Sequence, residues 1–121
     1  MKNVLVIDDD LLIGRLIDKL SRQNGAVSTI VRNGKEATSA LESGTTFHAI
    51  FLDLIVPDIN GWDILTVIKN DPVTREIPVI ILTGASLSKE EAGRLQNRVY
   101  AIIDKRTFDN DQINDILKRI V

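Results

Sequence analysis

The chain contains 121 residues, of which 44% are hydrophobic and 26% are charged, a size and composition suited to one globular domain spanning residues 1–121. Fifteen basic and 17 acidic residues give a net charge of −2, which argues against direct binding to nucleic acid. No apolar run is long enough to span a membrane, no secretory signal precedes the first strand-like segment, and cysteine is absent, so we expect a cytoplasmic protein.

Apolar runs of strand length recur along the chain, and four of them are continuous rather than alternating. Continuous runs are typical of strands that are covered on both faces, which indicates a parallel sheet between layers of helices. A fifth and weaker candidate follows Gly25. In chain order the predicted strands are Val4–Ile7, Ala26–Val31, Ala49–Leu52, Val79–Leu82 and Tyr100–Ile103.

Helical patterns fill the segments between and after these strands, so the predicted order is strand then helix, five times over. The second pattern closes at Gly44 and the third ends before Asp71-Pro72. Gly93 and a shortage of apolar residues predict a short or mobile fourth helix between residues 86 and 98. Asp109 or Asn110 is expected to cap the last helix. The residues expected to face the core are Leu12, Leu16, Ile17 and Leu20; Ala37, Ala40 and Leu41; Leu65 and Ile68; Leu87, Ala92 and Leu95; and Ile113, Ile116, Leu117, Ile120 and Val121.

Polar side chains follow four of the predicted strands, at the edge where ligands bind in open parallel sheets. The first predicted strand runs into Asp8-Asp9-Asp10 and the third into Asp53. The fourth runs into Thr83 and the fifth into Asp104-Lys105. Taken alone, Asp10 or Asp104 is as compatible with a solvated loop residue or a helix cap as with a role in the site. The set as a whole predicts a functional site at this edge.

Charge balance within this set indicates a divalent cation. Asp8, Asp9 and Asp53 sum to −3 and Lys105 supplies +1, which leaves −2 to be neutralised. Oxygen-only ligands with open positions for water suit Mg²⁺. A cation and a lysine beside an aspartate also suit phosphoryl transfer, with Asp53 as the nucleophile and with Thr83 and Lys105 contacting the phosphoryl oxygens.

The motifs around these positions resemble the receiver domain family of response regulators. The matching pieces are residues 4–10, 51–61 and 77–84, followed by Lys105. The resemblance implies a doubly wound, flavodoxin-like sheet of strand order 2-1-3-4-5. It also implies a Mg²⁺ ion held by Asp8, Asp9, Asp53 and the backbone carbonyl of Ile55.

The resemblance further implies a role in two-component signalling. The phosphoryl group would pass to Asp53 from a sensor histidine kinase or a histidine phosphotransfer domain, and Thr83 and Lys105 would contact it. The domain would catalyse only its own phosphotransfer and dephosphorylation, and would signal by conformational change to a downstream effector protein or fused domain. Several segments also resemble receivers fused to hybrid sensor histidine kinases.

Three positions depart from the family pattern or bear on its kinetics. Arg106 stands where the family usually has a proline after a cis bond, so we predict a trans Lys105–Arg106 bond and a rearranged loop. Ile102 replaces the aromatic residue that acts as a switch, and Tyr100 is expected to pack rather than substitute for it. The apolar side chain of Ile55 cannot orient a hydrolytic water, which predicts a long-lived phosphorylated state.

Other protein classes fit the sequence less well. A haloacid-dehalogenase-type phosphatase needs a second aspartate two positions after Asp53, where this chain has Ile55. A flavodoxin-like cofactor carrier needs a phosphate cradle after the first strand, where three aspartates would repel phosphate. The remaining alternative is a pseudo-receiver, an interaction module with the same fold that is not phosphorylated. His48 is expected to be a surface or capping residue, and Trp62 a partly buried packing residue.

Overall fold

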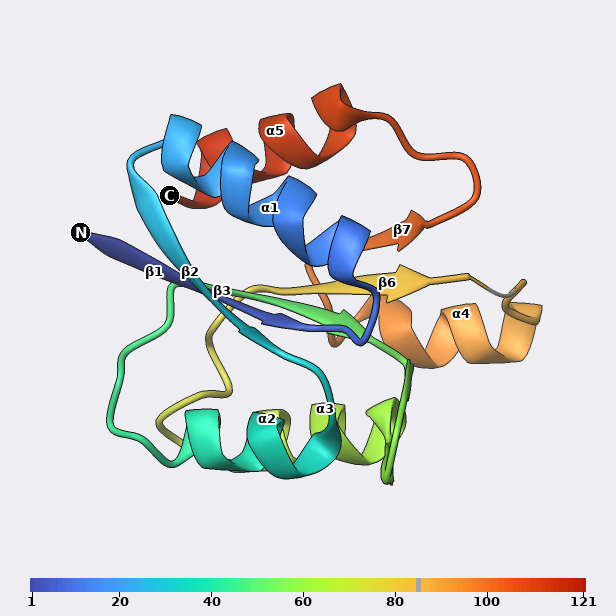
Figure 1. Cartoon of the computed structure of the whole chain (residues 1–121). Coiled ribbons are helices and arrows are strands. Elements are labelled where there is room, and N and C mark those ends of the chain that lie inside the picture. The colour runs from blue at the N-terminus through green and yellow to red at the C-terminus, as the bar shows by residue number, and fades with distance from the viewer. Residues whose placement is uncertain (85) are drawn as a thin grey trace.

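A computed structural model describes residues 1–84 and 86–121 of the chain. Five parallel strands form its central sheet in the order β2-β1-β3-β6-β7 (Figure 1). The order 2-1-3-4-5 predicted for the five main strands is therefore confirmed, with ends that shift by one or two residues. The strands are β1 Lys2–Ile7, β2 Ala26–Val31, β3 Ala49–Asp53, β6 Val79–Thr83 and β7 Ala101–Asp104.

Five helices cover the two faces of this sheet, as the sequence predicts. Helices α1 (Leu11–Gln23) and α5 (Asn110–Ile120) lie on one face, and α2 (Gly34–Leu41), α3 (Gly61–Asn70) and α4 (Lys89–Gln96) lie on the other (Figure 1). Successive strand residues point to opposite faces, so each strand contributes to both halves of the core. None of the helices in the described part of the chain is long and apolar enough to cross a membrane.

The first turn of α1 differs from the prediction. The Asp10 carboxylate accepts hydrogen bonds from the backbone N–H groups of Leu12 and Ile13, which fixes the start of the helix. From this start, Ile13, Ile17 and Leu20 face the sheet, whereas Leu12 is 76% exposed. The expectation that Leu12 lies on the buried stripe is therefore wrong.

Helix α4 is short, as expected from its sequence. It has eight residues and begins at a capping box between Ser88 and Glu91. Leu95 is its one fully buried side chain among the residues described, so little apolar packing holds the helix against the sheet. Ala85, which lies in the segment that resembles hybrid-kinase receivers, is outside the described residues.

The segment after β3 forms a small antiparallel hairpin that the sequence did not predict. Its strands are β4 Ile55–Val56 and β5 Ile59–Asn60, and Asp58 between them has a φ of 69°. The Asp58 carboxylate accepts hydrogen bonds from the backbone N–H groups of Gly34 (2.6 Å) and Lys35 (3.3 Å). These bonds join the hairpin to the start of α2 and hold Asp58 in its uncommon backbone conformation.

Candidate functional site

The polar residues predicted at the strand ends meet at one edge of the sheet. Asp53 ends β3 opposite Leu82 of β6, and Thr83 ends β6 opposite Asp104 of β7. Asp8 follows β1 directly. Asp8, Asp53 and Thr83 are only 1%, 5% and 6% exposed, although all three are polar. Buried polar groups of this kind need specific partners, so the edge is a built site rather than a solvated rim.

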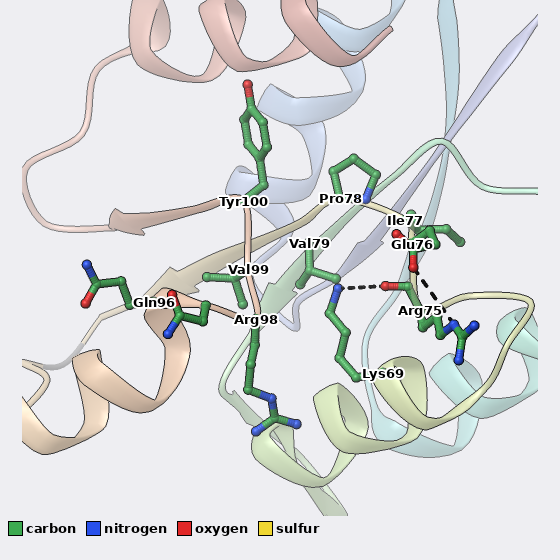
Figure 2. Close-up of a pocket in the computed structure, with 11 residues that line it drawn as sticks. Lys69, Arg75, Glu76, Ile77, Pro78, Val79, Gln96, Arg98, Val99 and Tyr100 are labelled. Carbon is green, nitrogen blue, oxygen red and sulfur yellow. Dashed lines mark hydrogen bonds and ion pairs between the residues drawn. The ribbon is translucent and has the colours of Figure 1, made fainter.

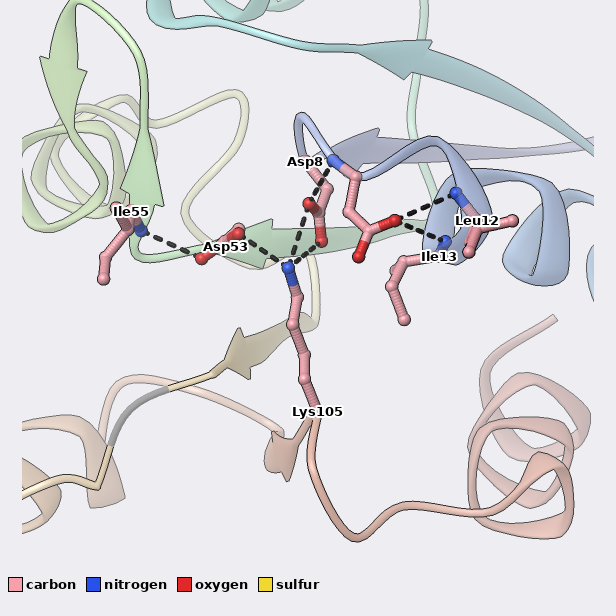
Figure 3. Close-up of polar contacts among 7 residues, drawn as sticks. Asp8, Leu12, Ile13, Asp53, Ile55 and Lys105 are labelled. Carbon is pink, nitrogen blue, oxygen red and sulfur yellow. Dashed lines mark hydrogen bonds and ion pairs between the residues drawn. The ribbon is translucent and has the colours of Figure 1, made fainter.

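Lys105 joins the two buried carboxylates (Figure 3). Its Nζ lies 2.8 Å from Asp53 Oδ2, and 3.0 and 2.8 Å from Oδ1 and Oδ2 of Asp8. The second oxygen of Asp53, Oδ1, accepts a hydrogen bond of 2.9 Å from the backbone N–H of Ile55. One ammonium group therefore bridges two strand ends that are 45 residues apart in sequence, counted from Asp8 to Asp53.

The Asp8 carboxylate is incompletely paired. Its Oδ1 accepts a hydrogen bond of 2.8 Å from the backbone N–H of Asp10. Its Oδ2 is fully buried and, despite its proximity to Lys105, has no donor in hydrogen-bonding geometry among the described residues. Burial raises the pKa of Asp8 to about 6, to which the charge of Asp53 contributes, while Lys105 and the Asp10 N–H oppose the shift.

Lys105 keeps its charge in this environment. Burial alone would lower its pKa, but hydrogen bonds to Asp53 and Asp8 outweigh burial and raise the pKa above the ordinary value. The site thus contains a permanent cation beside a carboxylate that gives up its proton only near pH 6.

Asp9 completes an acidic cluster with Asp8 and Asp53. One carboxylate oxygen from each residue lies within 4.8 Å of the others, and Asp9 is exposed to solvent. Oxygen-only clusters of this kind suit hard divalent cations, and Asp8 Oδ2, which accepts no hydrogen bond among the described residues although Lys105 lies close to it, is an available ligand atom. The role predicted for the Ile55 carbonyl stays a prediction, because the contact described for Ile55 is made by its N–H.

Asp10 and Asp104, which sequence reasoning left open, lie beside the site rather than in it. Asp10 is the N-cap of α1. Asp104 accepts hydrogen bonds from the backbone N–H of Arg106 at 2.8 Å and from its guanidinium at 2.8 and 3.1 Å. These bonds from Arg106 lower the pKa of Asp104 to about 2. Arg106 also donates a hydrogen bond of 3.3 Å to Ser86, on the loop that follows Thr83.

The network around Arg106 was not predicted from the sequence beyond a rearranged loop. No cis peptide bond occurs between the described residues, so the predicted trans bond between Lys105 and Arg106 is confirmed. An acidic residue two positions before an arginine at the end of a strand is the signal that could have indicated the network.

The predictions for the surrounding residues have mixed outcomes. Ile102 is half-buried and packs on the face covered by α2, α3 and α4. Tyr100 is 46% exposed because it precedes β7, so the expectation that it packs is wrong. Trp62 is partly buried as predicted, and the Arg94 guanidinium lies 5.7 Å from its ring centroid. His48 caps the sheet as predicted, because its Nδ1 accepts a hydrogen bond of 3.1 Å from the Asn3 N–H.

Comparisons with known proteins agree on one family. Residues 4–118 match the response regulator receiver domain. A two-component response regulator from Oryza sativa is 31% identical over 68% of this chain and 63% of its own length. The N-terminal domain of a response regulator receiver protein from Methanoculleus marisnigri is 28% identical, with a TM-score of 0.77 over 100% of this chain and 97% of that one.

A further structural match concerns the fold alone. The receiver domain of a sensor histidine kinase from Pseudomonas aeruginosa, described with a magnesium ion in its active-site cleft, is 24% identical with a TM-score of 0.82. The match covers 98% of this chain and 96% of that domain. The chain spans 52% and 63% of the length of the first curated relatives it matches.

Proposed function

The chain belongs to the response regulator receiver domain family, whose members accept phosphoryl groups from histidine kinases, and we propose that Asp53 is its phosphoacceptor. The observation that best supports this assignment is the bridge from Lys105 to both Asp53 and Asp8 at the carboxyl ends of β1 and β3. We further propose that residues 1–121 form one receiver domain.

Asp8, Asp9 and Asp53 are proposed to hold Mg²⁺. The cluster fits this ion because its ligands are carboxylate oxygens, because the buried Asp8 Oδ2 accepts no hydrogen bond among the described residues, and because Lys105 pairs with Asp8 and Asp53 and brings one positive charge to three acids. We extend the ligand set to the Ile55 carbonyl by resemblance to the family. When bound, the ion would neutralise charge on the transferred phosphoryl group.

The chain's own residues account for the remaining chemistry. A carboxylate oxygen of Asp53 attacks the phosphorus of a phosphohistidine, the phosphorus–nitrogen bond breaks, and the imidazole leaves with the bonding electron pair. The Ile55 N–H keeps the Asp53 side chain oriented through Oδ1. Lys105 and the Thr83 hydroxyl then contact the phosphoryl oxygens, whose charge grows as the bond to nitrogen breaks.

Reversal of the modification is proposed to be slow. Hydrolysis of the aspartyl phosphate requires a water aligned opposite Asp53, and the domain would catalyse this step itself. The Ile55 side chain is 68% exposed beside Asp53 and offers no polar atom to such a water. A phosphorylated state that outlasts the encounter with its donor suits a signal passed on to a partner.

The partners are proposed from the surface around the site. Leu11 and Leu12, at the start of α1, are 48% and 76% exposed, and Ile55 is 68% exposed. Apolar side chains around a buried acceptor suit docking of a histidine kinase or histidine phosphotransfer domain. The output would then pass to an effector protein or a fused domain, in the cytoplasm, where such kinases present their phosphohistidine.

Activation with Mg²⁺ and a mimic of the phosphoryl group tests the proposal. The chain is incubated with Mg²⁺ and beryllofluoride, a mimic of the phosphoryl group, and the fluorescence of Trp62 is followed. We expect a saturable change that requires Mg²⁺ and is lost in Asp53→Asn. An unchanged signal, together with unchanged amide spectra by NMR, would instead identify the chain as a pseudo-receiver.

A further inference from the structure

A cleft of about 480 Å³ opens at the edge of the sheet opposite the proposed phosphorylation site (Figure 2). One wall is the last turn of α3 with the segment that leads into β6, and the other is the end of α4 with the segment that leads into β7. Ile77 and Val99, both partly buried, contribute apolar surface between the walls. The cleft is therefore separate from the cluster around Asp53.

The cleft is positively charged in a chain whose net charge is −2. Lys69, Arg75 and Arg98 line it, against the single carboxylate of Glu76. Glu76 lies 3.9 Å from Arg75, and both side chains are well exposed. In residues 1–84 and 86–121, neither Lys69 nor Arg98 has an ion-pair partner within 4.0 Å.

Lys69 and Arg98 are also half-buried, so both basic groups are partly removed from solvent without a carboxylate partner. Lys69 Nζ donates one hydrogen bond of 3.1 Å, to the backbone carbonyl of Arg75. Burial lowers the pKa of Lys69; the charge of Glu76 opposes this shift and the charge of Arg98 adds to it. An anion in the cleft would offset the cost of keeping Lys69 charged in this partly buried position, and would reduce the repulsion between Lys69 and Arg98.

We propose that this cleft binds an acidic segment of a partner protein, whose carboxylates pair with Lys69 and Arg98. The three basic side chains come from separate segments and end apart from one another rather than converging on one point (Figure 2). Carboxylates spaced along a peptide can meet such dispersed charges, whereas one small anion can meet only some of them. The apolar surface between the walls suits a neighbouring apolar side chain of the same segment.

The net charge of the chain makes this binding specific to the cleft. An acidic peptide is not attracted by an acidic protein as a whole, so its affinity must come from a local surface. The cleft also lies at the far end of β6 from Thr83, so an occupant leaves Asp53 accessible to its phosphodonor. This inference goes beyond the phosphoacceptor function and does not depend on it.

The test uses the full chain and a fluorescein-labelled hexaglutamate peptide, followed by fluorescence anisotropy at low ionic strength. Lys69→Gln/Arg98→Gln is expected to raise Kd about tenfold, the equivalent of one lost charge-assisted contact. Arg15→Gln/Lys19→Gln, a pair of exposed residues on α1 with the same change of net charge, is the control and should leave Kd within about twofold.

Two further arms separate this inference from the alternatives. Binding should weaken with added NaCl and should be equal in Asp53→Asn, since the peptide does not use the phosphorylation site. The proposal is overturned if Lys69→Gln/Arg98→Gln binds the peptide like the parent, or if inorganic phosphate at the same concentration displaces the peptide. The second result would identify a site for small anions.

Discussion

At the scale of single residues, Asp8 is part of the site but its buried charge lowers the stability of the fold. Its pKa of about 6, against 3.8 for an ordinary aspartate, means that the folded domain binds this proton more tightly than the unfolded chain does. The free energy of unfolding therefore falls as pH rises from about 4 to about 6, as far as Asp8 is concerned. Above pH 6 the domain holds an unfavourable buried charge.

Asp8→Asn should accordingly stabilise the metal-free domain at pH 7. One pKa unit corresponds to about 1.4 kcal/mol, so we expect a gain of about 1 to 3 kcal/mol in denaturant unfolding with EDTA present. The gain should vanish below pH 4. The exposed Asp9→Asn is the control, and a gain as large as that of Asp8→Asn would show that burial is not the cause.

Mg²⁺ should reverse the order of stability of the two proteins, so that the parent becomes more stable than Asp8→Asn. It is expected to raise the midpoint of thermal unfolding of the parent but not of Asp8→Asn, because only the parent retains the buried ligand oxygen. The affinity for Mg²⁺ should also fall below pH 6, where protons compete for Asp8. Isothermal titration calorimetry at pH 5 and pH 7.5 checks this, and equal affinities at the two pH values would contradict it.

Ile55 is the residue to which we attribute slow loss of the phosphoryl group. Ile55→Asn introduces a side-chain amide beside Asp53 that can hydrogen-bond a water. We expect dephosphorylation to accelerate about fivefold, the equivalent of one hydrogen bond of about 1 kcal/mol. Ile55→Val, which stays apolar, should leave the rate unchanged. An Asn variant as slow as the parent would show that another group controls the water.

At the scale of the elements, the hairpin after β3 depends on the absence of a side chain at Gly61. A Cβ there would lie 2.4 Å from the Leu54 Cα and 2.7 Å from the Asp53 carbonyl oxygen. The glycine serves close packing, because a positive φ in this segment occurs at Asp58 instead. The start of α3 can therefore lie directly against Leu54, the residue that follows the proposed phosphoacceptor Asp53.

Gly61→Ala and Gly93→Ala should have opposite effects on stability. The first forces backbone atoms apart and should destabilise the domain by about 2 kcal/mol or more. The second adds a methyl group with nothing within 4 Å inside helix α4, and should stabilise it by about 1 kcal/mol. Urea unfolding of both variants measures the difference, and a neutral Gly61→Ala would disprove the close approach.

The loop after β7 shows how the chain replaces a proline with an ionic network. Asp104 accepts hydrogen bonds from the backbone N–H and from the guanidinium of Arg106, and the guanidinium also donates a hydrogen bond to Ser86 on the neighbouring loop. Lys105 lies between these two residues in sequence, so the network limits the positions that its ammonium can adopt. The same bonds connect the loop that presents Lys105 to the loop that follows Thr83.

Arg106→Ala should therefore affect phosphorylation more than folding. We expect the rate of phosphorylation by acetyl phosphate to fall about two- to fivefold, with an unchanged free energy of unfolding, because exposed ion pairs contribute little to stability. Arg119→Ala, an exposed arginine on α5, is the control. If Arg106→Ala phosphorylates at the rate of the parent, the network does not position Lys105.

At the scale of the whole molecule, the sequence predicted the sheet and the polar residues at the carboxyl ends of its strands. Continuous apolar runs are a strong signal for doubly covered strands, and each functional side chain lies within two residues after such a run. The missed features depend on contacts between distant segments. Asp58 accepts hydrogen bonds from the start of α2, and Arg106 donates one to Ser86. Leu12, in the first turn of α1, faces outward although it was expected on the buried stripe.

The exposure of Tyr100 has a local origin. Its strand begins one residue later than the apolar run suggests, so the side chain precedes β7 and lies partly in solvent. Ile102, at the position of the usual aromatic switch, packs against the core on the α4 side. Any conformational response to phosphorylation must then use groups other than a rotating aromatic ring at this position.

Intact-mass spectrometry after incubation with acetyl phosphate tests the central claim most directly. The account predicts that the parent chain gains the mass of one phosphoryl group when Mg²⁺ is present, and that it gains none with EDTA. Asp53→Asn should remain unmodified, while Asp104→Asn, which alters an acid beside the site, should still be modified. A parent chain that stays unmodified, or an Asp53→Asn variant that is modified equally, would contradict the assignment of Asp53.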